Sequence, residues 1–251
     1  MSILFLTAAG AAPEATAQFG LIPALKEGGP ISIAIFSVMV IMSVFSFYIM
    51  FTKLFEQHKV MNQYKQLRAQ FWRAASLEEG ASKLDKNSAY RQVADDGIAA
   101  QKQHGLLTDP VEAHDWIHGA MERSKDAINS KLSTGLPFLA TVGATAPFVG
   151  LLGTVIGIYS ALIKIGIAGQ ADIGKIAGPV GESLIMTAVG LFVAVPAVLA
   201  YNWLQARNKT IASSLSAFST ELIGFMSSGG RLKPAPTAAA AGKPAPAAIK
   251  K

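Results

Sequence analysis

The sequence predicts an all-α integral membrane protein with three transmembrane helices. Three stretches of the chain contain no Asp, Glu, Lys or Arg, at residues 30–52, 132–163 and 183–206. Each is longer than the ~18–20 apolar residues that cross about 30 Å of hydrocarbon as a helix. Only 15% of the residues are charged, against about a quarter in a typical soluble domain. Buried helices of soluble proteins seldom stay apolar on all sides over such lengths, so a membrane location is the stronger interpretation.

The first apolar stretch, "PISIAIFSVMVIMSVFSFYIMFT", is bulky and apolar on every side. This composition predicts a peripheral helix whose side chains face lipid. The chain continues past residue 52 without Gly or Pro, which predicts that the helix extends beyond the membrane. Apolar residues then recur at spacings of three to five, an imperfect amphipathic stripe. The stripe consists of Phe55, Val60, Tyr64, Leu67 and Phe71.

The segment 53–131 holds 12 basic and 11 acidic residues and is predicted to be helical. Its last part, "EAHDWIHGAMERSKDAINSKLSTGLPFLATVG", is expected to run from a charged helix directly into the second apolar stretch. Beyond Gly229, the chain is rich in Pro, Ala and Lys. This composition offers no residues for a core, so we expect residues 229–251 to be disordered.

The second and third apolar stretches carry small residues at helical spacing. Gly150, Gly153 and Gly157 recur along the second stretch, and Gly190 lies on a similar stripe of the third. Small residues let helix backbones approach closely in lipid, where packing drives association. These glycines are therefore predicted to be helix-packing residues. Two such faces and an intramembrane acid favour a homo-oligomer, because oligomerisation provides each of them with a partner.

Glu182 is the charged residue at the head of the third apolar stretch, in "GPVGESLIMTAVGLFVAVPAVLAYN". A charge at membrane depth costs at least ~2.5–3.5 kcal/mol and indicates function by default. Burial would favour its protonated form, as a proton relay requires. The alternative is a helix-start residue in water at the outer interface. Thr154 and Thr187 are the other candidates, since threonine hydroxyls either line a hydrated path or bond to carbonyls of their own helix.

Other chemical motifs are weak. His114 and His118 lie four residues apart, a spacing that can bind a metal, but no third ligand is evident and a solvated helix face is the better interpretation. Cysteine is absent, which excludes disulfides and thiolate metal sites. We find no phosphate loop, nucleophile elbow or paired catalytic carboxylates, so no enzyme, cofactor or metal is predicted. The net charge of +6 arises from the C-terminal flank and tail, and it fits membrane orientation better than nucleic-acid binding.

Two motifs together resemble a known family. "TVGATAPFVGLLGTVIGIYSALI", followed by "GPVGESLIMTAVGLFVAVPAVLAYN", is similar to the core of the ExbB/TolQ/MotA proton-channel superfamily, and most similar to its ExbB members. The resemblance covers about residues 137–205, with both motifs in the right order on the right helices. The N-terminal stretch and the Pro/Ala tail show no useful match. The three-span layout makes the four-span MotA branch a weaker match.

The resemblance implies a complete working assembly. ExbB-like proteins form homo-pentamers around a central pore in the inner membrane, and the pore holds helices of ExbD that carry an essential Asp. The complex uses the proton-motive force to energise TonB, which opens outer-membrane receptors for import. The family's pore carboxylate corresponds to Glu182 and its two pore threonines to Thr154 and Thr187. The implied partners are ExbD, TonB and membrane lipids. A TolQ-like subunit energising TolA, and a passive oligomeric scaffold, remain as alternatives.

Lys and Arg cluster after the first and third apolar stretches, which predicts a cytoplasmic location for residues 53–131 and for the C-terminus. In a bacterial inner membrane, the chain is predicted to begin with a periplasmic segment, cross the membrane once, and form a cytoplasmic helical domain. It then crosses back, forms a periplasmic loop with a helix start, crosses a third time, and ends in a cytoplasmic helix extension and a tail. The corresponding ranges are 1–29 (periplasmic), 30–52 (first span), 53–131 (cytoplasmic domain), 132–163 (second span), 164–181 (loop), 182–206 (third span), 207–228 (extension) and 229–251 (tail).

Overall fold

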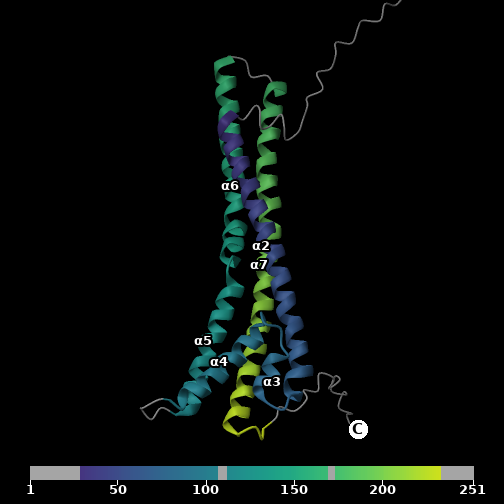
Figure 1. Ribbon diagram of the computed structural model, residues 1–251. Coiled ribbons are helices and arrows are strands. Elements are labelled where there is room, and N and C mark those ends of the chain that lie inside the picture. Colours follow the sequence, from purple (N-terminus) through teal and green to yellow (C-terminus); the bar gives the residue numbers. More distant parts are fainter. Residues whose placement is uncertain (1–28, 107–111, 169–172, 233–251) are drawn as a thin grey trace, which may run out of the picture. The chain divides into compact units, whose positions relative to one another are not determined.

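The computed structural model describes residues 29–106, 112–168 and 173–232. At Lys164, Ala168, residues 173–179 and Glu182 it describes the backbone alone. The predicted N-terminal segment and most of the predicted tail therefore lie outside the described residues. Figure 1 shows the elements, which are α2 (Gly29–Gln70), a 3-10 turn η1 (Phe71–Arg73), α3 (Leu77–Ser82), α4 (Ala89–His104), α5 (Ala113–Ser133), α6 (Leu136–Ala168) and α7 (Ile173–Ser227).

The predicted all-helical fold is confirmed for the described part of the chain, which contains no strand. Three regions are long and apolar enough to cross a membrane, at Gly29–Arg73, Ala113–Ile167 and Ser183–Ser227. They contain the three uncharged stretches of the sequence. The three-span prediction thus agrees with the helices that the chain forms.

The predicted continuous helix from the charged segment into the second span is interrupted. Helix α5 ends at Ser133, Gly135 adopts a left-handed φ of +87°, and α6 begins at Leu136. Glycine takes such a φ without a steric penalty. Pro137 follows as the second residue of α6, where its missing N–H costs no helical hydrogen bond. A Gly–Leu–Pro sequence therefore ends one helix and starts the next.

The chain forms two compact units. Among the described residues, unit 1 comprises 29–47, 140–168 and 173–198, and unit 2 comprises 48–106, 112–139 and 199–232. Helices α2 and α7 each contribute one part to either unit. Most of α6 belongs to unit 1, whereas α3, α4 and α5 belong wholly to unit 2.

Unit 1 consists of three helical segments with small buried patches between them. One patch joins Ala146 of α6 to Ala194 and Ala197 of α7, and another joins Ile35 and Met39 of α2 to Met186 of α7. Large side chains on the outer faces stay exposed, for example Phe148 (71%) and Phe192 (74%). This pattern is typical of helices that are surrounded by lipid.

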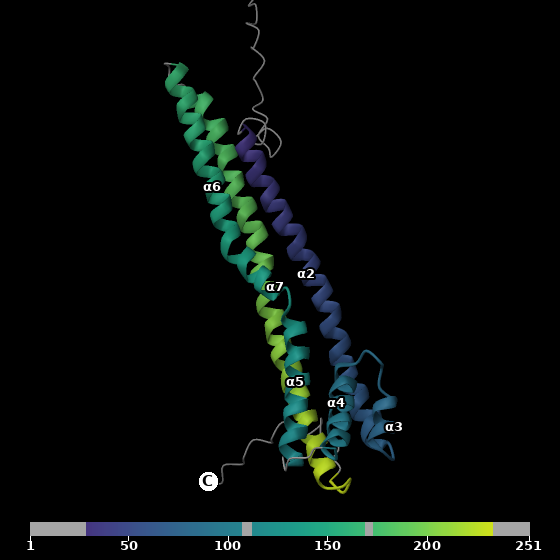
Figure 2. The ribbon, with the colours of Figure 1, turned by 60° about the vertical axis from the view of Figure 1, so that its left-hand side comes forward.

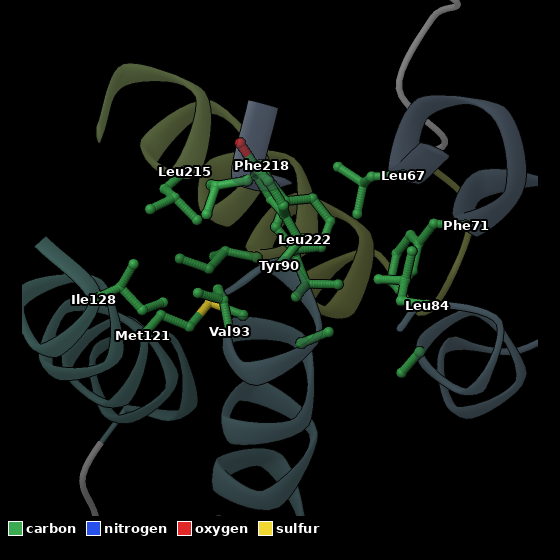
Figure 3. Close-up of a cluster of buried hydrophobic side chains, with 14 of the residues drawn as sticks. Leu67, Phe71, Leu84, Tyr90, Val93, Met121, Ile128, Leu215, Phe218 and Leu222 are labelled. Carbon is green, nitrogen blue, oxygen red and sulfur yellow. The ribbon is translucent and has the colours of Figure 1, made fainter. Parts of the chain in front are cut away.

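Unit 2 is a helical bundle with a core of large side chains. Helix α4 lies near the ends of α2 and α7, and α3 lies beside the end of α2 (Figure 2); residues of all four helices and of α5 share one buried cluster. Leu67, Tyr90, Met121, Phe218 and Leu222 converge on the centre of the bundle, and each is at most 1% exposed (Figure 3).

The amphipathic stripe predicted after the first span is mostly correct. Val60, Leu67 and Phe71 are buried, and Tyr64 packs against the core. Phe55 is an exception, because 75% of it is exposed. Five residues separate Phe55 from Val60, more than one helical turn of 3.6 residues, so Phe55 falls outside the buried face.

Candidate proton-pathway site

Helices α6 and α7 run side by side in unit 1 with their backbones in contact (Figure 2). A Cβ atom on Gly150 would lie 2.7 Å from the carbonyl oxygen of Met186 and 3.2 Å from the Cα atom of Gly190. A Cβ atom on Gly190 would lie 2.7 Å from the carbonyl oxygen of Ala146. Real Cβ atoms do not come this close to backbone oxygens. The two glycines therefore allow an approach that any larger residue would prevent.

The close contact continues toward Glu182 along both helices. A Cβ atom on Gly157 would collide with the hydroxyl of Ser183, which is itself buried. A Cβ atom on Gly153 would lie 3.1 Å from Cβ of Met186 and 3.4 Å from Cγ2 of Ile35. All four glycines singled out in the sequence thus lie where α6 meets α7. Ile35 belongs to α2, so α2 also reaches this contact.

The two candidate threonines differ in their surroundings. Thr154 is only 4% exposed, and its hydroxyl donates a hydrogen bond of 2.7 Å to the carbonyl oxygen of Leu151. Its hydroxyl therefore bonds within its own helix. Thr187 is half-buried, and its Cα atom would lie 3.2 Å from a Cβ atom on Gly150. Thr187 therefore lies at the α6–α7 contact, and Thr154 is a buried residue of α6 between Gly153 and Gly157 in the chain.

Glu182 lies inside α7 and does not begin it. The helix starts at Ile173, so more than two turns of about 3.6 residues precede Glu182. Its side chain lies outside the described residues. Ser183, the next residue, is buried at 5% exposure. The uncharged stretch begins at Ser183, whereas the helix begins at Ile173, so composition alone did not identify the start of the helix.

Two contributors to this region were not predicted as site residues. Ser183 packs on Gly157, and Met186 packs on Gly150 and Gly153. Ser183 lies on the small-residue stripe of the third apolar stretch, which was a usable signal, whereas Met186 is a large residue outside that stripe. The contribution of Ile35 had no such signal, because contacts between helices far apart in the sequence leave no trace in residue spacing.

The histidine pair lies on α5, in unit 2. Both imidazole rings are exposed, with their centroids 6.1 Å apart, and His118 Nε2 lies 3.5 Å from a carboxylate oxygen of Glu122. Within residues 29–106, 112–168 and 173–232, no three His, Cys, Asp or Glu side chains are grouped closely enough to hold a metal ion. The pair is thus a feature of the exposed helix face.

Comparisons with known proteins identify the family of this chain. Residues 86–217 match the model of the MotA/TolQ/ExbB proton channel family. The matched region contains the whole α6–α7 contact and the unit 2 helices α4 and α5.

Individual relatives cover most of the chain. It is 35% identical to the biopolymer transport protein ExbB of Xanthomonas campestris pv. campestris, over 81% of this chain and 84% of that protein. It is 32% identical to ExbB of Neisseria meningitidis serogroup B, over 78% and 92% of the two chains. The Tol-Pal system protein TolQ of Pseudomonas aeruginosa is 35% identical over 60% of this chain and 68% of its own. With its three membrane-length helices, the chain therefore belongs to the MotA/TolQ/ExbB proton channel family.

Proposed function

We propose that this protein is an ExbB-type subunit of a TonB–ExbB–ExbD motor, which couples the proton-motive force to TonB-dependent import across the outer membrane. One observation carries the proposal. The similarity to the ExbB proteins of Xanthomonas campestris, Neisseria meningitidis and Pseudomonas putida spans 81%, 78% and 65% of the chain. The similarity to the TolQ proteins of Pseudomonas aeruginosa and Haemophilus influenzae spans less of it, 60% and 42%. The family and the three apolar helices support a location in the bacterial inner membrane.

The proposed topology follows from the distribution of Lys and Arg. The N-terminus and the 164–181 segment lie in the periplasm, and unit 2 with the C-terminus lies in the cytoplasm. Five copies of the chain form a pentamer around a pore, which ExbD helices occupy. The glycine contacts bring α6 and α7 together as one packed pair, and such a pair is suited to form one wall segment of the pore.

In the proposed mechanism, Glu182 accepts a proton from one side of the membrane and releases it to the other. A carboxyl group among apolar helices can perform this step because desolvation favours its protonated form, whereas hydration from a pore favours its charged form. Thr154 and Thr187 line the path nearby. The Asp of ExbD receives the proton in turn. Each proton that crosses gains about 2.3 kcal/mol per 100 mV of membrane potential, so several protons supply enough free energy to move one set of helices against another.

The decisive experiment replaces Glu182 in a bacterial strain that lacks its own ExbB. We expect Glu182→Gln to abolish TonB-dependent uptake of a ferric siderophore, because an amide has the size of the carboxyl but cannot exchange a proton. Glu182→Asp keeps a titratable group one methylene shorter and should retain part of the uptake. Glu112→Gln makes the same chemical change at an exposed position of unit 2 and should leave uptake intact.

Oligomer assembly must be measured on the same variants. Loss of uptake with pentamers intact, shown by native mass spectrometry of the detergent-solubilised complex, supports the proton relay. Loss of pentamers in Glu182→Gln would instead favour a passive scaffold whose carboxyl fixes helix packing. Normal uptake by Glu182→Gln would contradict both roles for this side chain.

The TolQ alternative has a specific observation behind it, since the chain is 42% identical over 108 residues to TolQ of Haemophilus influenzae. Expression in strains lacking either ExbB or TolQ separates the two functions. We expect rescue of siderophore uptake in the first strain and continued detergent sensitivity in the second. The reverse result would assign the chain to the Tol-Pal system.

A further inference from the structure

Unit 2 contains a cavity that no part of the proposed motor uses. Its volume is about 800 Å³, and it is formed by α2, α4, α5 and the turn that precedes α4. Charged and polar side chains line much of it, among them Gln63, Ser88 and Lys131. A hollow of this size with polar walls is large enough for a small polar ligand.

The N-terminus of α4 lies at this cavity without a cap. Ser88 is the N-cap residue, but its side chain makes no capping hydrogen bond, and the first helical bond runs from Gln92 N–H to the carbonyl oxygen of Ser88. Helix α3 shows the usual arrangement, in which the Ser76 hydroxyl accepts a hydrogen bond of 3.2 Å from Glu79 N–H. The first N–H groups of the 16-residue α4 therefore offer unfilled donors and the positive end of the helix dipole.

Two buried polar atoms in the cavity wall lack hydrogen-bond partners. Ser88 is 3% exposed and Gln63 is 5% exposed. The Oγ atom of Ser88 and the Oε1 atom of Gln63 have no hydrogen bond to any described residue. Buried polar atoms are nearly always paired, because leaving one unpaired costs free energy. The Gln63 amide also offers a donor group after a half-turn about its last bond. Both side chains indicate that something polar completes this site.

The charges around the cavity favour an anion. Lys59, Lys86 and Lys131 line it, together with Glu56, Asp95 and Asp96. Two of the acids are already neutralised by cations outside the lining, since Glu56 pairs with Lys53 at 2.7 Å and Asp95 with Arg91 at 3.3 Å.

Lys59 is 3.6 Å from Asp85 and is therefore partly neutralised. Lys86, Lys131 and Asp96 make no ion pair within the described part of the chain. The two unpaired lysines therefore outnumber the one unpaired acid in the lining. A net positive charge thus faces the open helix N-terminus, which is the arrangement that binds phosphate groups.

We propose that this cavity binds a phosphate monoester group, with its oxygens on the first N–H groups of α4, on the Ser88 hydroxyl and on the ammonium groups of Lys86 and Lys131. Phosphate fits better than a carboxylate because donors converge from α4, the preceding turn and α5, and phosphate presents three oxygens to them. The same group occurs on soluble metabolites and on phosphatidic acid in membranes.

The test uses the purified full-length protein in a phosphate-free maltoside detergent. Glycerol 3-phosphate is titrated and its binding followed by the shift in thermal unfolding temperature and by ³¹P line broadening. We expect saturable binding that weakens about tenfold in Lys86→Gln and in Lys131→Gln, since each removes one charge-assisted hydrogen bond. Lys65→Gln removes an exposed lysine of α2 outside the cavity and should bind as the unmodified protein does.

A second arm distinguishes the two sources of phosphate. The protein is placed in nanodiscs of phosphatidylcholine with or without phosphatidic acid. Stabilisation by phosphatidic acid that is lost in Lys86→Gln identifies the lipid headgroup as the ligand, whereas a response to glycerol 3-phosphate alone identifies a soluble one. No saturable response in either arm, or an equal loss in Lys65→Gln, overturns the proposal.

Ser88→Asp provides an independent check that does not depend on removing charge from the wall. Its carboxylate would cap α4 and occupy the place of the phosphate. We expect a higher unfolding temperature without ligand and no further rise with glycerol 3-phosphate. A Ser88→Asp variant that still binds glycerol 3-phosphate as the unmodified protein does would show that the helix N-terminus is not the site.

Discussion

Unit 1 and unit 2 differ in the side chains that form their closest helix contacts. In unit 1 the buried contacts are made by residues such as Ala146, Gly150 and Gly190, while Phe148 and Phe192 are exposed. In unit 2 the buried centre is made of large side chains such as Tyr90 and Phe218, which are 1% and 0% exposed. The difference reflects the solvent. Water drives large apolar groups inward in unit 2, whereas lipid gives no such drive in unit 1 and leaves close backbone packing as the source of association.

Truncation of a core aromatic in unit 2 should have the largest effect on stability. The Phe218 ring packs edge-on against Phe71, with centroids 5.3 Å apart. We expect Phe218→Ala to lower the free energy of unfolding of unit 2 by about 3–5 kcal/mol, because it leaves a cavity in a dense core. Loss of near-ultraviolet circular dichroism with rising urea measures the change.

Phe55→Ala is the matched control for Phe218→Ala. Phe55 is 75% exposed, so its truncation should change the unfolding midpoint little. A similar destabilisation by both variants would show that unit 2 is not packed around the Phe218 cluster.

Enlargement of a small residue should break unit 1 by the opposite mechanism. We expect Gly190→Leu to destabilise the α6–α7 pair by about 1–3 kcal/mol or more, because its side chain would have to displace the backbone of Ala146. Thermal unfolding in detergent reports the loss. Gly166→Leu is the control on α6, since nothing lies within 4 Å of the position of its Cβ atom. Equal tolerance of both substitutions would contradict close packing at Gly190.

The smallest predicted effect is local to α3, on the surface of unit 2. The hydrogen bond from Lys83 and the hydrogen bond from Ala75 N–H lower the pKa of the Glu79 carboxyl below its ordinary value of 4.5. A lowered pKa means that this contribution to stability is present above about pH 4.5 and is lost as the pH falls through the lower native value. Hydrogen exchange of the α3 amides should therefore quicken in acid, beyond its intrinsic pH dependence.

Two variants test that contribution. Glu79→Gln should remove the acid sensitivity of α3 while leaving the core of unit 2 protected. Ser76→Ala removes the cap itself and should destabilise α3 by about 1 kcal/mol at neutral pH. If Glu79→Gln keeps the full acid response, another carboxyl group is responsible for it.

Much of the fold was predictable because the signals are local. Uncharged runs identified the three membrane-length helices, and the glycine spacing singled out Gly150, Gly153, Gly157 and Gly190 before any contact was known. Helix ends were harder to predict. The break at Gly135 and the start of α7 at Ile173 depend on backbone geometry that composition does not report. The role of Glu182 in proton transfer stays a prediction.

The sequence by itself determined the all-helical class, the three apolar helices and the family, because each depends on residue types at short and regular spacing. Only the tertiary structure decided which faces meet. It placed Gly150 on Gly190, brought Ile35 of α2 to Gly153, and left Phe55 exposed while Phe71 is buried. It also joined Gln63, Ser88 and Lys131 around one cavity. Such contacts link residues that are far apart in the chain, and packing between whole helices, rather than local spacing, selects them.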